Sequence, residues 1–119
     1  MKPSYIFLNV AAFCGAANAF WGQMAAELKH EDEGGVYQWV HLTDYNTGSR
    51  YSTQLPGGFD GCASPFACYP VFREDSGGSY SFHSKVWRSA DGCHHIDFQG
   101  GLDAHEGWCC GSLPCDFSA

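Results

Sequence analysis

The last quarter of the chain concentrates the side chains that could carry chemistry. The stretch DGCHHIDFQGGLDAHEGWCCGSLPC, residues 91–115, holds three of the six histidines and four of the seven cysteines. Histidine and cysteine are common zinc ligands, whereas histidine beside carboxylates is typical of acid–base catalysis. The same cysteines could instead form disulfides, so the interpretation depends on the compartment in which the protein folds.

The spacing of these side chains argues against a metal site. Structural zinc sites usually take their ligands in pairs about two to four residues apart. His94 and His95 are instead adjacent, as are Cys109 and Cys110, and adjacent side chains of an extended chain point to opposite faces. We therefore predict no metal site, and nothing else in the sequence indicates a cofactor.

An acid–base cluster is the second interpretation of the same stretch. His95, Asp97 and His105 are residue types that transfer protons, and His83 lies on a neighbouring predicted strand. No nucleophile accompanies them, so we predict no catalytic residue and no enzyme activity. A small secreted hydrolase is the enzyme alternative, and it requires these four side chains to meet in one pocket.

The N-terminus indicates the compartment. MKPSYIFLNVAAFCGAANA begins with one lysine, continues as a mostly apolar run and ends in the small-x-small pattern Ala17-Asn18-Ala19 that signal peptidase recognises. The apolar run is shorter than the about 20 residues needed to span a bilayer. We therefore predict a signal peptide over residues 1–19 and a secreted, extracellular protein.

Cleavage after Ala19 removes Lys2 and Cys14, which changes the net charge from −7 to −8 and leaves about 100 residues with six cysteines. This acidic chain argues against nucleic acid or membrane as a partner. An even set of cysteines on a short exported chain predicts three disulfides. A bond between adjacent cysteines would strain the peptide between them, so Cys109 and Cys110 are expected to pair elsewhere. The predicted disulfide cysteines are Cys62, Cys68, Cys93, Cys109, Cys110 and Cys115.

The secreted chain divides into two regions. Residues 20–35, FWGQMAAELKHEDEGG, contain helix formers followed by acids and a glycine pair, which predicts an acidic lead-in that is either flexible or a short helix. Residues 36–119 form a single disulfide-rich β domain, since strand-like segments bounded by turns recur along them. The predicted strands span residues 36–44, 50–55, 68–74, 79–88, 94–98 and 108–110.

These five or six strands, with no long helix, predict a mainly β fold. We expect a small antiparallel β-sandwich or barrel-like sheet cross-linked by three disulfides. The only helix that the sequence allows for is the short one within residues 20–35. Most of the many aromatic residues must lie in the core of so small a domain. Those on the second face of a strand would mark a binding surface, for which carbohydrate and protein ligands look alike. The predicted surface comprises Tyr37, Trp39, Trp87, His83 and His95.

A signal peptide, about 100 mature residues, three predicted disulfides and a β pattern rich in glycine and aromatic residues together resemble the small secreted cysteine-rich effectors of filamentous, plant-pathogenic fungi. The arginine-leucine-arginine motif of oomycete effectors is absent from residues 20–35. The resemblance implies a virulence effector that binds a host protein or a second secreted effector, outside plant cells or after translocation into them. It assigns no residue a role, because the class shares no motif.

A secreted antimicrobial or killer-type toxin is the alternative among binding proteins. Such toxins usually carry a cationic surface, against which the acidic composition counts. A carbohydrate ligand is compatible with the aromatic content, but no residue pattern supports it.

Overall fold

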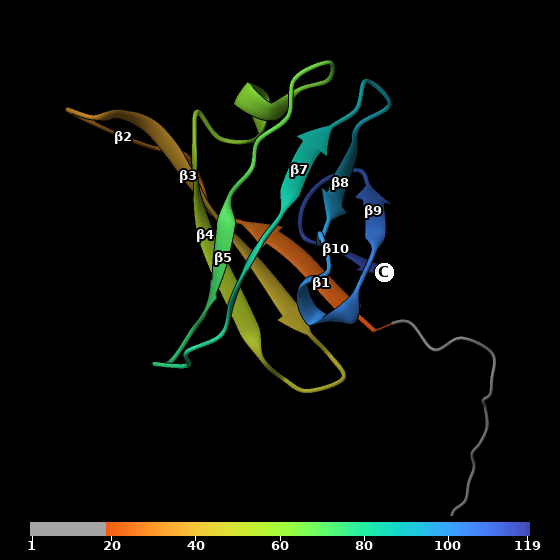
Figure 1. Cartoon of the computed structure of the whole chain (residues 1–119). Coiled ribbons are helices and arrows are strands. Elements are labelled where there is room, and N and C mark those ends of the chain that lie inside the picture. The colour runs from red at the N-terminus through yellow and green to blue at the C-terminus, as the bar shows by residue number, and fades with distance from the viewer. Residues whose placement is uncertain (1–18) are drawn as a thin grey trace, which may run out of the picture.

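The computed structural model describes residues 19–119, which form two antiparallel β-sheets (Figure 1). The predicted signal peptide, residues 1–19, lies outside the described residues except for Ala19. The larger sheet has the strand order β10-β1-β3-β4-β5-β6, and β2 also pairs with β3. Its strands are β1 Trp21–Ala26, β2 His30–Asp32, β3 Gly35–Asp44, β4 Arg50–Pro56, β5 Val71–Glu74, β6 Ser81–His83 and β10 Cys115–Ser118.

The smaller sheet has the order β7-β8-β9. The predicted mainly β, antiparallel fold with three disulfides is confirmed. The helical elements of residues 19–119 are two short 3-10 turns, η2 Phe59–Cys62 and η3 Gly101–Asp103. The strands of the smaller sheet are β7 Lys85–Arg88, β8 Cys93–Asp97 and β9 Glu106–Cys110.

One apolar core lies between the two sheets. Val40 and Leu42 of β3 are fully buried, whereas Trp39, which precedes Val40 and points to the other face, is partly exposed, as the alternation of a strand requires. The smaller sheet contributes Val86 and Ile96 to the same cluster. The largest fully buried side chains are Phe20, Phe72, Phe98, Met24, Leu42, Leu55 and Ile96.

Residues 21–26 form β1, which lies between β10 and β3 in the larger sheet. The prediction of a flexible lead-in or short helix is therefore wrong for these residues. β1 pairs with β10 on one side and with β3 on the other. Phe20 and Met24 are buried in the core. Helix propensity is a weak preference, and here the burial of two large apolar side chains and pairing on both edges override it.

Gly22 permits this close pairing of β1 with β3. A Cβ atom at Gly22 would lie 1.8 Å from the carbonyl oxygen of Thr43 and 2.9 Å from the ring of Phe20. No real Cβ atom tolerates the first contact, so every other residue would force the two strands apart. The glycine therefore determines how closely the N-terminal strand can lie in the sheet.

The segment predicted as one strand over residues 79–88 is two strands in two sheets. β6 and β7 are separated by Ser84, where the chain leaves the larger sheet for the smaller one. Ser84 is fully buried, and its hydroxyl donates to the carbonyl oxygen of Pro70 at 2.9 Å. Phe82 and Val86 both face the core, so the alternation continues unbroken through the change of sheet.

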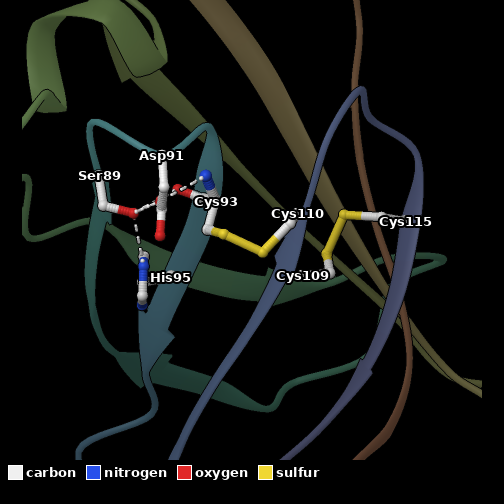
Figure 2. Close-up of a disulfide and its surroundings, with 7 residues drawn as sticks. All are labelled: Ser89, Asp91, Cys93, His95, Cys109, Cys110 and Cys115. Atoms are coloured by element: carbon white, nitrogen blue, oxygen red, sulfur yellow. Dashed lines mark hydrogen bonds between the residues drawn. A yellow bond between two sulfur atoms is a disulfide. The ribbon is translucent and has the colours of Figure 1, made fainter.

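Disulfides join all six cysteines of the described chain. Cys62 bonds to Cys68, Cys93 to Cys110 and Cys109 to Cys115. The adjacent Cys109 and Cys110 thus pair elsewhere, as expected, and Figure 2 shows their bonds leaving β9 on either side. Because Cys115 begins β10, the Cys109 bond ties the smaller sheet to the larger one. Three disulfides indicate an oxidising environment.

Candidate functional site

Three aromatic rings stand side by side across the outer face of the smaller sheet. Trp87 of β7 pairs in register with His95 of β8, which pairs with Trp108 of β9. The ring centroids of Trp87 and His95 are 4.9 Å apart with planes 8° from parallel, and those of His95 and Trp108 are 6.0 Å apart at 27°. Trp108 is 56% exposed. We call Trp87, His95 and Trp108 the aromatic row.

A charged row lies beside the aromatic row on the same face. Lys85, Asp97 and Glu106 are paired across β7, β8 and β9. The Lys85 ammonium lies 5.0 Å from the ring centroid of Trp87, within cation–π range. Tyr69 extends this face, because the backbone pairing of Cys68 with Val86 places the next residue beside Lys85. Tyr69 is 67% exposed.

The β7–β8 turn fixes the central ring of the aromatic row (Figure 2). The Ser89 hydroxyl donates to the Asp91 carboxylate and lies 2.9 Å from Nε2 of His95. With its single proton given to Asp91, the Ser89 oxygen accepts the Nε2 proton of His95. The Ser89 hydrogen bond holds the pKa of Asp91 below its usual value. The network therefore positions His95, and it leaves the serine without a base to activate it.

A second network crosses the outer face of the larger sheet. Nε2 of His41 lies 2.7 Å from the Glu27 carboxylate, and Nδ1 lies 2.6 Å from the Ser52 hydroxyl. The order of carboxylate, histidine and hydroxyl is the one used in nucleophilic catalysis. Here, however, the Ser52 hydroxyl donates to Asp75 at 2.7 Å, so His41 does not receive its proton. The network ties the end of β1 to β3, β4 and the turn after β5.

Sequence reasoning missed this second network. The turn Tyr45-Asn46-Thr47-Gly48 centres the β3–β4 hairpin between Asn46 and Thr47, and such a hairpin pairs His41 with Ser52, as observed. That pair could have been found from the turn signal alone. Glu27 could not, because it lies in the segment that was predicted to be a lead-in.

The predicted binding surface is divided between the two outer faces of the sandwich. Trp87 and His95 meet in the aromatic row, and Trp108 is the member that the prediction omitted. Trp39 and Tyr37 lie on β3 in the larger sheet, where their rings stack on His41 and His30. His83 lies on β6, also in the larger sheet, and is exposed.

The four side chains of the hydrolase alternative are not joined to one another. His95 and Asp97 share one face of β8, His105 precedes β9, and His83 belongs to the other sheet. No hydrogen bond or ion pair between residues 19 and 119 links any two of them. In the same range, no group of three or more histidine, cysteine or acidic side chains is placed to hold a metal ion.

No helix within residues 19–119 is long and apolar enough to cross a membrane. Comparison of the chain with known proteins found no matching family model, no similar curated protein and no matching solved structure. Within residues 19–119, the aromatic row brings together exposed rings, charged neighbours and the supporting hydrogen bond of Ser89 on one face.

Proposed function

We propose that the protein is a secreted virulence effector of a filamentous, plant-pathogenic fungus and that it acts by binding a host protein or a second secreted effector. The observation that carries the binding function is the aromatic row on the outer face of the smaller sheet. Trp108 contributes nothing to the core there and stays 56% exposed. Exposed tryptophan within a cluster of aromatic rings is typical of the few residues that dominate a protein–protein interface.

The orientation of the rings favours a protein over a carbohydrate. A sugar ring binds flat on the open face of an aromatic side chain, whereas in the aromatic row the faces are turned toward each other. His95 is stacked against a tryptophan on both sides, and the Lys85 ammonium lies over Trp87. At Trp87 and His95 the row therefore presents mostly ring edges, which suit the irregular surface of a protein partner.

The aromatic row is also held rigid before any partner binds. His95 is hydrogen-bonded to Ser89, and the Cys93–Cys110 disulfide joins the next pair of residues on the same face of β8 and β9. A side chain that is already ordered loses little conformational entropy on binding. The charged row of Lys85, Asp97 and Glu106 supplies the polar rim that such interfaces have beside their apolar centre.

The toxin alternative finds less support than the effector. Membrane-active and killer-type toxins depend on cationic surfaces, while this chain has six basic and thirteen acidic residues. Three disulfides in about 100 residues suit a protein that persists among extracellular proteases.

The proposal is tested first in the producing organism. Culture filtrate should contain a chain that begins at Phe20, as identified by N-terminal sequencing, and deletion of the gene should reduce virulence on the host plant. Complementation with the wild-type gene is the control and should restore virulence. Retention of the chain inside the cell, or unchanged virulence after deletion, contradicts the effector function.

A further inference from the structure

The Cys93–Cys110 disulfide lies on the same outer face of the smaller sheet as the aromatic row. Cys93 and Cys110 face each other in the pairing of β8 with β9, and His95 and Trp108 are the next pair on that face. Figure 2 shows the bond beside His95 and the turn that supports it. Any change in this bond is therefore made directly next to the row.

This bond is also the disulfide that an attacking thiol can reach most easily. Cys110 is exposed, although Cys93 is buried. The apolar core cluster of residues 19–119 includes neither Cys93 nor Cys110, whereas all four cysteines of the other two bonds belong to it or pack against it. A thiolate must approach a sulfur atom to break a disulfide, so access decides which bond reacts first. The other four cysteines are Cys62, Cys68, Cys109 and Cys115.

The bond holds its two strands close together. The Cys93–Cys110 pair is of the non-hydrogen-bonded kind, because the flanking bond runs from the Gly111 N–H to the Gly92 carbonyl oxygen. The Cα atoms of Cys93 and Cys110 are 3.8 Å apart, compared with about 4.5 Å in an ordinary pair of this kind. Two unbonded sulfur atoms need more room than two bonded ones, so reduction moves the strands apart at this position.

Two sets of contacts carry this movement to His95. Along the strands, the next pair on the same face is His95 with Trp108, and the stacking of their rings depends on the spacing of β8 and β9. In the β7–β8 turn, the Cys93 carbonyl oxygen accepts from the Ser89 N–H at 3.0 Å, and the Cys93 N–H donates to Asp91 at 3.1 Å. Ser89 in turn holds Nε2 of His95. Movement of Cys93 therefore disturbs both the stacked rings and their hydrogen-bonded support.

We propose that a dithiol reductant reduces Cys93–Cys110 before the other two disulfides and that this reduction disorders the aromatic row. A thiolate of the reductant attacks Sγ of Cys110, and the S–S bond breaks with its electron pair passing to Sγ of Cys93, which takes up a proton. The second thiol of the reductant then displaces Cys110 from the mixed disulfide. The protein disulfide is reduced to two thiols, the dithiol is oxidised to a disulfide, and two protons pass from the reductant to the cysteines.

The bond thus makes the aromatic row dependent on its compartment. The row is complete in an oxidising compartment and disordered where thiol reductants are abundant, as in the cytosol. The partner of the row is therefore met outside cells. This regulation of partner binding rests on the proposed function, whereas the selective reduction and the change in the row rest on the geometry of the chain alone.

Timed reduction tests the first step. The mature, oxidised chain is treated with dithiothreitol, and free thiols are alkylated at intervals. Tandem mass spectrometry then assigns the label and separates Cys109 from the adjacent Cys110. Cys93 and Cys110 should be labelled at least about tenfold faster than the other four cysteines. Earlier reduction of either other bond, or simultaneous reduction of all three, would overturn the proposal.

Nuclear magnetic resonance of the chain reduced at this one bond tests the second step. The signals of the Trp108 indole N–H and the His95 ring should shift, while the indole of Trp21, on the outer face of the larger sheet, should not. Unchanged Trp108 and His95 signals would contradict disorder of the row. Equal shifts at Trp21 would also contradict it, because they would indicate a general loss of structure.

Two matched variants separate this bond from disulfides in general. Cys93→Ser/Cys110→Ser should show the Trp108 shift without reductant, whereas Cys62→Ser/Cys68→Ser should show it only after dithiothreitol is added. Amide dispersion reports folding, and the reduced wild-type chain decides if a variant is unfolded. A wild-type Trp108 signal in folded Cys93→Ser/Cys110→Ser would overturn the proposal. None of these measurements involves a host plant, so their outcome is separate from that of the virulence test.

Discussion

Two serine hydroxyls each connect a histidine to an aspartate on opposite outer faces of the molecule. Ser89 lies between His95 and Asp91, and Ser52 lies between His41 and Asp75. In both places the hydroxyl proton goes to the carboxylate, so the serine orients a ring instead of acting as a nucleophile. At the residue scale, these two serines thus orient histidine rings that stack against tryptophan.

Acidification tests the network around Glu27. The hydrogen bond from His41 lowers the pKa of Glu27 from its usual 4.5, and the charges of His41 and His30 add to this. A carboxyl whose pKa is lower in the folded state contributes stability that is present above its unfolded pKa and lost as the pH falls through its folded pKa. The free energy of unfolding should therefore fall as the pH drops below 4.5, and Glu27→Gln should reduce that fall.

Urea denaturation at a series of pH values measures this effect. Glu31→Gln, at an exposed position of β2, is the matched control and should follow the wild-type curve. If Glu27→Gln also ran parallel to the wild type below pH 4.5, the ion pair with His41 would have no role in stability.

Ser89 offers a residue-scale test of the aromatic row. Ser89→Ala removes the hydroxyl that His95 and Asp91 share, and it should cost about 1 kcal/mol of unfolding free energy. It should also weaken the near-ultraviolet circular dichroism of the stacked tryptophans, since Nε2 of His95 loses its partner. Ser112→Ala, in the exposed β9–β10 turn, should change neither quantity. An unaltered tryptophan signal in Ser89→Ala would mean that stacking alone orders the row.

At the scale of elements, the close contact of β1 with β3 depends on one glycine. Gly22→Ala would place a Cβ atom 1.8 Å from the Thr43 carbonyl oxygen, so the strands must separate. We expect a loss of about 3 kcal/mol or failure to fold, measured by urea denaturation. Gly61→Ala is the control, because its Cβ would make only an ordinary 3.5 Å contact with Pro56. Equal stability of the two variants would contradict the pairing of β1 described here.

The disulfides differ in the length of chain that they close. Cys93–Cys110 closes a sequence separation of 17 residues and Cys62–Cys68 one of 6. Because a longer loop restricts the unfolded chain more, the double variant Cys93→Ser/Cys110→Ser should lose about 3 kcal/mol and Cys62→Ser/Cys68→Ser about 2 kcal/mol. Thermal and urea unfolding of the two variants measure the difference. The reverse order would show that native packing, and not loop closure, decides the contribution of each bond.

The elements that could be predicted from the sequence are those in which local pattern and tertiary pairing agree. The strands at residues 36–44 and 50–55 alternate and flank a clear turn, and they form the central hairpin β3–β4. Residues 21–26 could not be predicted, because their helix-forming side chains become a strand only through pairing with β3 and β10. β10 is a short segment after Pro114 with little strand pattern of its own. It is held in place by the Cys109–Cys115 bond and by pairing with β1.

The same reasoning explains what could be predicted of the candidate site. Trp87 and His95 were expected on outward-facing positions, since their strands alternate. Prediction of the complete aromatic row would have required the register of β8 against β9, because that register places Trp108 beside His95. Register between strands connected by a turn as irregular as residues 98–105 is not encoded in a recognisable local motif. The adjacent cysteines, by contrast, restrict their own pairing by covalent geometry alone.

At the scale of the whole molecule, the two outer faces provide a matched comparison. Trp108 on the smaller sheet and Trp21 on the larger one are similarly exposed, at 56% and 52%. Each contacts one aromatic neighbour: Trp108 stacks on His95, and Trp21 meets Tyr45 edge to face. If an exposed tryptophan only promotes non-specific adsorption, substitution of Trp108 and substitution of Trp21 should reduce binding equally. If the aromatic row is a specific interface, only the substitution of Trp108 should reduce binding.

Quantitative affinity capture with these two variants tests the binding function most directly. The mature, oxidised chain, Trp108→Ser and Trp21→Ser are immobilised and exposed to extracellular fluid and tissue extract of the host plant and to secreted proteins of the producing organism. We predict a protein that wild type and Trp21→Ser retain equally, and that Trp108→Ser binds at least about tenfold more weakly. Equal capture by all three chains, or capture of no protein by the wild type, would contradict a binding function carried by the aromatic row.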